Sequence, residues 1–410
     1  MTGNGGTVRA GAVRELAERL LPGDAARDFV GSPAGLWVAL GAVAAGARGR
    51  AAEELRGVLG VAGAEAGPAV TGVAAELART SGVRAGVAVR SRVPVEEAYR
   101  SALPGVGFGG LAGDAQGELD AWVAEVSGGR LDALPDALDG GADLVLVGVV
   151  ALGAVWREAF DARGTRPAPF TGADGRVAEV PTMHRRVPAR WAWRVGGGVV
   201  VELPCAGERA PRVRFVRGPV GAGPDAVVPL GWAEEGREPV RAGGVELALP
   251  RFGLRGRIDA LAWLESLGVT APARPGADFS GLSSEPLYVS GAVQEAVVEV
   301  GEAGVEAAAV TQVEMARSAA RPLPAERIAF DRPFGVVVLD ADGRLPLFAG
   351  WWAGGGPRRG VTPDGTAGAG GLPGRPGRGC PGQEVTLAGP GGGARARRSP
   401  WQVREGRPGQ

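Results

Sequence analysis

The spacing of apolar residues predicts helices in the N-terminal third of the chain. "VRELAERLL" (13–21) carries apolar positions at helical spacing. The next segment, "SPAGLWVALGAVAAGARG" (32–49), opens with Ser32 as a helix cap and Pro33 at the first helical position. "RAAEELRGVLG" ends at Gly60, where a helix is expected to stop. Two more short helices are predicted in "VEEAYRSAL" (95–103) and "GELDAWVAEVSGG" (117–129).

From Leu144 onward the pattern changes and strands predominate. The longest apolar run, Leu144 to Trp156, is too short and too β-branched for a membrane helix, and it predicts a strand buried on both faces. Further strands are predicted in "VVVELPC" (199–205), "VELALPRFGL" (245–254), "LYVSGAVQEAVVEV" (287–300) and "RIAFDRPFGVVVLDADGRLPLFAGWW" (327–352), with a helix in "IDALAWLESLG" (258–268). Because helices and strands are segregated along the chain, the fold class expected is α+β.

The stretch "GEAGVEAAAVTQVEMARS", from Gly301 to Ser318, alternates with period two. Every second residue from Val305 is small or apolar or Thr, namely Val305, Ala307, Ala309, Thr311, Val313 and Met315, whereas the intervening set, Glu306, Ala308, Val310, Gln312 and Glu314, holds the charges. This pattern is typical of a strand with one buried face. Strands are nevertheless already predicted on both sides of it, so the alternation requires a separate explanation.

The C-terminal segment has a different composition. After Ala353 the chain is rich in Gly, Pro and Arg and has almost no apolar periodicity. Such a segment cannot bury enough apolar surface to offset the entropy of ordering it. We therefore expect one folded domain over residues 1–353 and a disordered tail over 354–410, with an interaction segment as the alternative.

Charge and cysteine content narrow the class of protein. The 410 residues carry 45 basic and 45 acidic side chains, and every basic residue is an arginine. Because the net charge is near zero, the composition favours neither a nucleic acid nor a membrane as partner. The first residues lack the apolar core of a signal peptide. Cys205 and Cys380 lie far apart, which makes a disulfide unfavourable and a cytoplasmic location the expectation, with secretion by another route as the alternative.

Candidate catalytic chemistry is sparse. His184 is the single histidine, which excludes multi-histidine metal sites, and we expect it at a strand end without a catalytic role. No Gly-x-Ser-x-Gly motif is present, and the glycines at 196–198 do not open a helix as a phosphate-binding loop would. The sequence therefore predicts no enzyme, no metal and no cofactor.

Four stretches in order give the chain a resemblance to the serpins, over about residues 8–353. They are "FVGSPAGLWVALGAVAAGARGRAAEELRGVLG", "ALGAVWREAFDARGTRPAPFTGADGRVAEVPTMHR", "LYVSGAVQEAVVEVGEAGVEAAAVTQVE" and "FDRPFGVVVLDADGRLPLFAG". The resemblance implies N-terminal helices around a large central β-sheet, further smaller sheets and an exposed reactive-centre loop. It also implies a monomeric, metastable inhibitor whose loop is cleaved by a serine protease and then inserts into the central sheet, a conformational change that traps the protease.

The resemblance also assigns roles to residues of the loop. The hinge that enters the sheet would comprise Glu302, Gly304, Val305, Ala307, Ala309 and Thr311. The reactive bond would be Arg317–Ser318, with Arg321 as the alternative. An arginine at that bond fits the acidic specificity pocket of a trypsin-like protease.

Residues near the opening of the sheet match the family unevenly. Trp156, the pair Glu302 and Arg251, and Ser32 match its pattern, whereas Gly35, Gly148 and Gln294 stand where it has a serine, an asparagine and a histidine. Gln294 can still donate and accept a hydrogen bond, but the glycine positions have no side chain to do so. Two functions therefore remain open: a suicide-type inhibitor of Arg-preferring serine proteases, or a non-inhibitory serpin whose loop is cleaved as a substrate.

Overall fold

The helices and strands assemble into three β-sheets with helices packed on the largest one. The structure is a computed structural model that describes residues 3–134, 138–139, 141–305 and 324–354. The segment that contains Ala307, Ala309, Thr311, Arg317, Ser318 and Arg321 lies outside these residues, as does the tail from residue 355.

The largest sheet, called the main sheet below, runs in the order β3-β2-β4-β14-β13. Its strands are β2 (Val83–Ser91), β3 (Val106–Gly110), β4 (Leu144–Leu152), β13 (Phe252–Asp259) and β14 (Val289–Val300), with the short strands β5 (Ala154–Val155) and β15 (Gly304–Val305) at one end. Strands β4 and β14 are parallel direct neighbours, and β13 and β2 flank them in antiparallel pairs.

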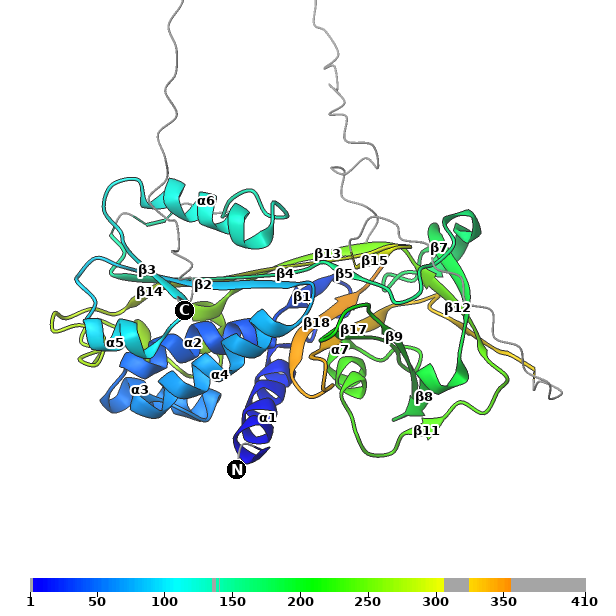
Figure 1. Ribbon diagram of the computed structural model, residues 1–410, viewed down its shortest axis with the longest axis horizontal. Coiled ribbons are helices and arrows are strands. Elements are labelled where there is room, and N and C mark those ends of the chain that lie inside the picture. The colour runs from blue at the N-terminus through cyan, green and yellow to red at the C-terminus, as the bar shows by residue number, and fades with distance from the viewer. Residues whose placement is uncertain (1–2, 135–137, 140, 306–323, 355–410) are drawn as a thin grey trace, which may run out of the picture. The chain divides into compact units, whose positions relative to one another are not determined.

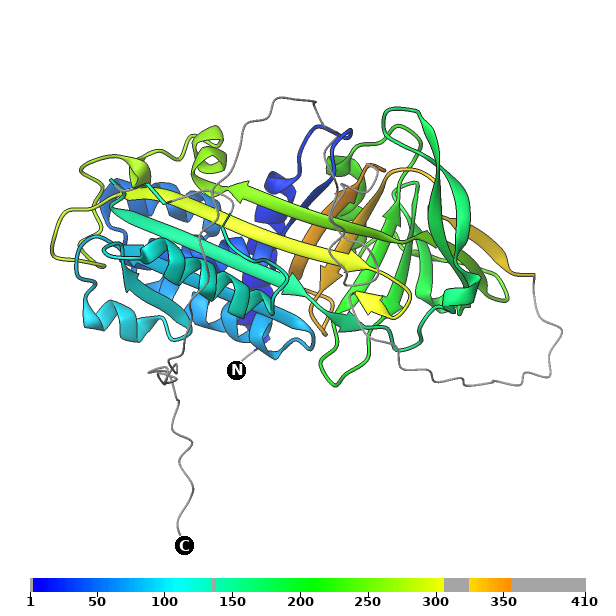
Figure 2. The same cartoon turned by 90° about the horizontal axis from the view of Figure 1, so that it is seen from above.

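Two further sheets form the other half of the described chain (Figure 2). The second sheet has the order β1 (Phe29–Gly31), β18 (Pro346–Trp352), β17 (Phe334–Leu339), β10 (Arg212–Arg217), β9 (Gly198–Pro204), β8 (Ala192–Val195) and β11 (Glu238–Pro239). The third sheet has the order β16 (Glu326–Ala329), β12 (Val245–Pro250), β7 (Val177–Val187) and β6 (Arg166–Thr171).

The sequence correctly predicts the start of α2 and the end of α3, whereas α1 begins ten residues earlier than predicted, α2 ends at Gly46, and α4 was not predicted. Ser32 caps the N-terminus of α2, where its Oγ accepts a hydrogen bond from the N–H of Gly35 at 3.0 Å. Gly60 ends α3 in the left-handed conformation at φ +75°. The helices are α1 (Gly3–Leu20), α2 (Pro33–Gly46), α3 (Gly49–Leu59), α4 (Ala66–Arg79), α5 (Glu97–Ala102), α6 (Ala115–Ser127), α7 (Pro224–Val227) and α8 (Ala260–Ser266), with 3-10 turns at Gly63–Glu65, Ala162–Gly164, Ala189–Trp191, Val228–Gly231 and Ala271–Ala273.

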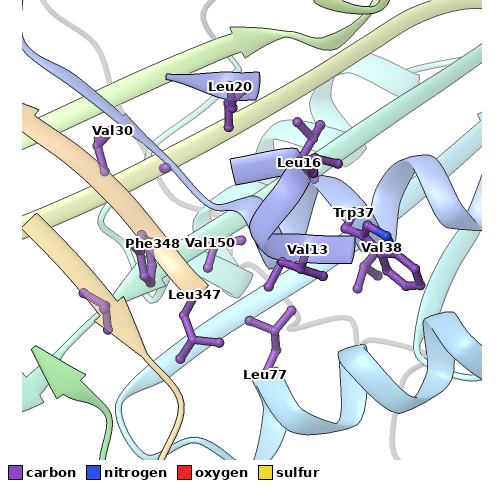
Figure 3. Close-up of a cluster of buried hydrophobic side chains, with 14 of the residues drawn as sticks. Val13, Leu16, Leu20, Val30, Trp37, Val38, Leu77, Val150, Leu347 and Phe348 are labelled. Carbon is purple, nitrogen blue, oxygen red and sulfur yellow. The ribbon is translucent and has the colours of Figure 1, made fainter. Parts of the chain in front are cut away.

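The main sheet is covered on both faces. Figure 1 shows α6 on one face and α2 with its neighbouring helices on the other. Every residue of β4 is buried as a result, which confirms the strand buried on both faces over Leu144–Leu152; the remainder of the predicted run forms the separate short strand β5. Figure 3 shows part of the core beneath the sheet, where Trp37 of α2 lies beside Val13 and Leu16 of α1, and side chains of β4 and β18 belong to the same cluster.

These sheets and helices confirm the α+β class and the fold implied by the resemblance, with differences in detail. The stretch predicted as one strand at 245–254 is two strands in different sheets, because the chain crosses from the third sheet to the main sheet at Arg251, whose N–H donates to the carbonyl of Pro181 at 2.8 Å. The stretch at 327–352 likewise forms three strands. Strands β2 and β3 precede Leu144, so strands are not confined to the C-terminal part as expected.

We find no single helix in the described ranges that is long and apolar enough to span a membrane. One bent pair, Gly49–Leu59 with Gly63–Arg79 at 41°, meets the criteria of length and composition.

Candidate functional site

At one end of the main sheet the chain turns back on itself directly after β14. Val300, the last residue of β14, pairs with Val305 of β15, and the N–H of Gly301 donates to the carbonyl of Gly304 at 2.9 Å. Trp156 holds this turn from the side, since its Nε1 donates to the carbonyl of Gly301 at 2.9 Å and its N–H to that of Ala303 at 3.0 Å. Trp156 is itself 3% exposed. The turn is therefore fixed by backbone and indole hydrogen bonds at the end of β14.

Glu302, inside this turn, joins three separate segments. Its carboxylate lies 3.6 Å from Nη1 of Arg251 and accepts a hydrogen bond from Oγ1 of Thr165 at 2.8 Å. Its carbonyl accepts from the N–H of Phe160 at 2.8 Å. The structure thus brings together Glu302 and Arg251, as the resemblance implies. Thr165 was missed, because nothing in the sequence links it to a residue 137 positions away.

Gly304 and Val305 form a short strand that fits between β14 and β5. A Cβ at Gly304 would lie 2.2 Å from the carbonyl oxygen of Ala154, so this position accepts glycine alone without a backbone shift. Val305 is 0% exposed and pairs with Val300 on one side and Ala154 on the other. Its side chain belongs to the core on the α2 face of the sheet. The strand is antiparallel to both of its neighbours.

Beyond this short strand the main sheet is closed. Strands β4 and β14 pair with each other from Leu144 opposite Val289 to Leu152 opposite Val298. A strand that continued past Val305 between them would have to break this parallel ladder. Each broken bond would be replaced, because the incoming backbone offers donors and acceptors to both sides.

A second cluster ties the middle of β14 to the beginning of α2. The side-chain Oε1 of Gln294 accepts a hydrogen bond from the N–H of Ser32 at 2.8 Å, and its Nε2 donates to the carbonyl of Ser32 at 2.8 Å. The hydroxyl of Ser32 donates to the carbonyl of Leu347 in β18 at 2.6 Å. Gln294 is 1% and Ser32 0% exposed. One glutamine side chain therefore satisfies two backbone groups in the core.

The two glycines of this region differ in what they require. A Cβ at Gly35 would lie 2.5 Å from Cγ2 of Val150 and 3.1 Å from Nε2 of Gln294, so a serine there would displace its neighbours. Gly148, opposite Gln294 in the β4–β14 pair, leaves ordinary contact distances of 3.8 Å or more to Ala39 and Gln294. The absence of a side chain at Gly35 therefore makes room for the amide of Gln294.

Other candidate groups lie apart from this end of the sheet or carry no chemistry. His184 lies within β7 rather than at its end, and its Nδ1 is 3.0 Å from the carbonyl oxygen of Thr182. Cys205 is a free, buried cysteine, and burial raises the pKa of its thiol to about 12, which leaves it uncharged at neutral pH. Among the described residues no group of His, Cys, Asp or Glu is arranged to hold a metal ion.

Comparisons with known proteins agree with this arrangement. Serpin-Z1C of Triticum aestivum is 28% identical over 366 residues, which cover 80% of this chain and 90% of that protein. Antithrombin-III of Ovis aries is 27% identical over 271 residues, covering 62% and 56%. In fold, the native state of the thermophilic serpin tengpin matches with a TM-score of 0.74 at 19% identity, covering 86% of this chain and 95% of that one. Human thyroxine-binding globulin matches with a TM-score of 0.71 at 21% identity, covering 84% and 98%.

A family model described as "Serpin (serine protease inhibitor)" matches residues 13–353. This match spans all three sheets, the turn at Glu302 and the Ser32–Gln294 cluster. The chain belongs to the serpin family.

Proposed function

We propose that this serpin is a suicide-type inhibitor of Arg-preferring, trypsin-like serine proteases. The protease serine attacks the carbonyl of Arg317, the bond to Ser318 breaks, and the new amino terminus leaves with the proton that the protease histidine supplies. The acylated segment then inserts between β4 and β14 before water can hydrolyse the ester. The chain is an inhibitor in this account and not an enzyme.

The burial of Val305 between β14 and β5 is the observation that carries this proposal. The first residue of the alternating stretch already has the position that insertion requires of it. Because successive side chains of a strand point to opposite faces, Ala307 and Ala309 would follow Val305 onto the α2 face, and Glu306 would face the other side.

If the pairing of Val305 continues without a shift, the inserted strand reaches the middle of the main sheet at Thr311. Each step down the inserted strand moves one residue back along β4 and β14, so Thr311 would lie opposite Gly148 and Gln294. The space beside Gly148 and the hydrogen-bonding amide of Gln294 suit a threonine there. The sheet-opening residues thus receive the one polar side chain on the inward face of the stretch.

The same register supports Arg317 over Arg321 as the cleaved residue. Met315 would lie opposite Leu144, the first residue of β4. The alternate residues that would face inward, here called the inward set, run from Val305 to Met315 and thus end where β4 begins. An acyl group on Arg317 would be carried to the far end of the main sheet. Cleavage at Arg321 would leave four more residues between the inserted strand and the protease. The longer connection would hold the protease less closely against the end of the main sheet.

The driving force for insertion follows from strand direction. Strands β4 and β14 are parallel, whereas β15 is antiparallel to both of them. Insertion therefore replaces one parallel ladder with two antiparallel ladders, which are slightly more stable per residue. A closed native sheet of this kind is held by a kinetic barrier rather than by equilibrium.

A non-inhibitory serpin is the second candidate. The observation that favours it is the altered cluster at Ser32, where Gln294, Gly35 and Gly148 replace the residues of the family pattern. Thyroxine-binding globulin, one of the structural matches, is named for a ligand that it binds. In this alternative the loop is cleaved and the protease is released active.

Incubation with trypsin separates the two candidates. The proposal predicts an SDS-resistant complex at near-equimolar stoichiometry. Residual trypsin activity should fall in proportion to the amount of complex formed. Complete cleavage of the chain after Arg317 or Arg321 with full recovery of trypsin activity would favour the second candidate and contradict inhibition.

A further inference from the structure

The outward face of the third sheet carries a concentration of positive charge. Strand register places Arg166 opposite Thr182, and His184 lies two residues along the same strand. Arg186 and Arg327 both lie opposite Glu246, one on each side of it. These side chains share one face, because residues that are directly opposite or two apart in a sheet point the same way. The cationic face is defined here as Arg166, His184, Arg186, Glu246 and Arg327.

The arginines of this face have no carboxylate partners. Arg166, Arg186 and Arg327 are exposed, and within the described part of the chain none of them forms an ion pair. Arg186 donates to the carbonyl of Gly243 at 3.1 Å, which leaves its charge uncompensated. Three arginines and one glutamate give a net charge of two positive units before His184 is counted.

The face is also hollowed. His184, Arg166, Arg327 and Glu246 line a depression of about 380 Å³ together with Arg185, Leu247 and Ala248. Arg185 itself is neutralised, since it pairs with Glu158 and lies over the rings of Phe160 and Trp191. The unpaired guanidinium groups of Arg166 and Arg327 therefore border a space that can admit a carboxylate side chain and offer it charge-assisted hydrogen bonds.

The position of this face relative to the cleaved segment indicates what would contact it. The turn that leads to Val305 contacts Arg251, the residue after β12, through Glu302, and after the segment outside the described residues the chain continues into β16, the strand that carries Arg327. Arg317 is nine residues before Glu326, a span of at most about 30 Å when fully extended. A protease domain of ~220 residues has a radius of gyration of about 17 Å, so its body is wider than this span. A protease attached to Arg317 must therefore lie close to the third sheet.

We propose that the cationic face is a docking surface for an acidic surface of the target protease, and that it accelerates encounter with proteases that carry negative charge beside their active site. This inference rests on the proposed function, because it assumes cleavage in the segment that precedes β16. Complementary charge raises association rates by steering the encounter and contributes less to the steps that follow contact. The cationic face would thus select among Arg-preferring proteases that Arg317 alone cannot distinguish.

The test compares anionic and cationic trypsin, two proteases with the same specificity and opposite net charge. The double variant Arg166→Glu/Arg327→Glu is measured beside Arg166→Gln/Arg327→Gln and beside Arg274→Glu. Arg274 is an exposed arginine that follows a turn bound to α3 through Glu54, and Figure 1 shows α3 at the opposite end from β12. Circular dichroism and thermal unfolding establish that each variant is folded.

At low salt, about 0.01 M, the Debye length is ~30 Å, and we expect the Glu double variant to react with anionic trypsin roughly fivefold to tenfold more slowly than the parent. The Gln double variant should show a smaller loss, and neither should slow with cationic trypsin. At about 1 M salt, where the Debye length is ~3 Å, the difference should vanish. The stoichiometry of the trapped complex should stay the same.

The proposal would be overturned if the Glu double variant reacted with anionic trypsin at low salt as fast as the parent does. It would also be overturned if Arg274→Glu slowed the reaction with anionic trypsin as much as the Glu double variant does. A further contrary result would be that added heparin speeds the reaction of the parent with both trypsins and has no effect on the double variant. That result would overturn the proposal as well, since the face would then bind a polyanion. If no trapped complex forms with the parent, the proposed function fails, but the second-order rate of loop cleavage still reports the encounter and still decides the docking proposal.

Discussion

The Gln294 side chain offers a direct test of how the sheet is held closed. Replacing it with Ala removes the acceptor of the Ser32 N–H, which is buried at 0% exposure. The carbonyl of Ser32 keeps a partner, because it also accepts from the N–H of Leu36 at 2.9 Å. One orphaned buried donor costs about 1–3 kcal/mol. With ~2 kcal/mol as the central value, the midpoint of thermal unfolding of a folded domain of this length should fall by roughly 3 °C.

A functional change should accompany this loss of stability. Gln294 ties β14 to the start of α2, so its removal should also lower the barrier to separating β4 from β14. We expect Gln294→Ala to lose its reactivity with trypsin faster than the parent during incubation without protease, as the loop inserts uncleaved. Unfolding followed by fluorescence and residual inhibition after timed incubation measure the two effects.

Gln116→Ala is the matched control. Gln116 makes similar bonds, accepting from Leu138 at 2.7 Å and donating to Asp120 at 3.0 Å, but it is half-buried, so water can replace the lost side chain. We expect the two variants to differ in both measurements. The same unfolding midpoint and the same inactivation rate in Gln294→Ala and Gln116→Ala would show that the buried bonds of Gln294 do not hold the sheet closed.

Three further predictions concern other parts of the chain. Gly304→Ala should destabilise by about 1–3 kcal/mol and expose the hinge to limited proteolysis, because the new methyl group meets the carbonyl of Ala154; unchanged unfolding and cleavage would contradict this. In a Cys380→Ser background, Cys205 should resist thiol reagents at pH 8 until the protein unfolds. Its raised pKa also predicts stability that is constant below about pH 9 and declines towards pH 12, where the unfolded thiol ionises first; rapid labelling of folded protein would show that it is accessible. Deleting residues 354–410 should leave the unfolding midpoint within a few degrees, and a large drop would show that the tail packs on the domain.

Local patterns in the sequence were enough to predict the elements whose stability is local. The Ser32 cap with Pro33 behind it gave the start of α2, and the uninterrupted apolar run gave β4. Helix α4 was missed because Gly67, Pro68 and Gly72 weaken its pattern, although a proline in the first turn of a helix costs little.

Features that depend on distant contacts were not predictable in the same way. Strand β2 was missed because Gly86 and two arginines interrupt it, and the structure explains the glycine, since a Cβ there would lie 2.8 Å from Trp122 of α6. Likewise the bonds from Gln294 to Ser32 span 262 positions. The reactive bond and the inward set beyond Val305 stay predictions from the sequence, because they lie outside the described residues.

The central claim is that the stretch after Val305 becomes a strand of the main sheet with alternate side chains buried. It is tested most directly by the partition between trapped and released trypsin in four single variants, Val305→Arg, Ala307→Arg, Glu306→Arg and Glu314→Arg. All four keep Arg317, so the initial attack should proceed at similar rates. An unpaired buried charge is strongly unfavourable; Val305 is already buried before cleavage, whereas Ala307 would become buried on insertion, so Ala307→Arg is the direct test of the inserting segment. We therefore expect Val305→Arg and Ala307→Arg to release active trypsin as substrates do, and Glu306→Arg and Glu314→Arg to trap it nearly as well as the parent. The same partition for the inward and outward sets would contradict the account.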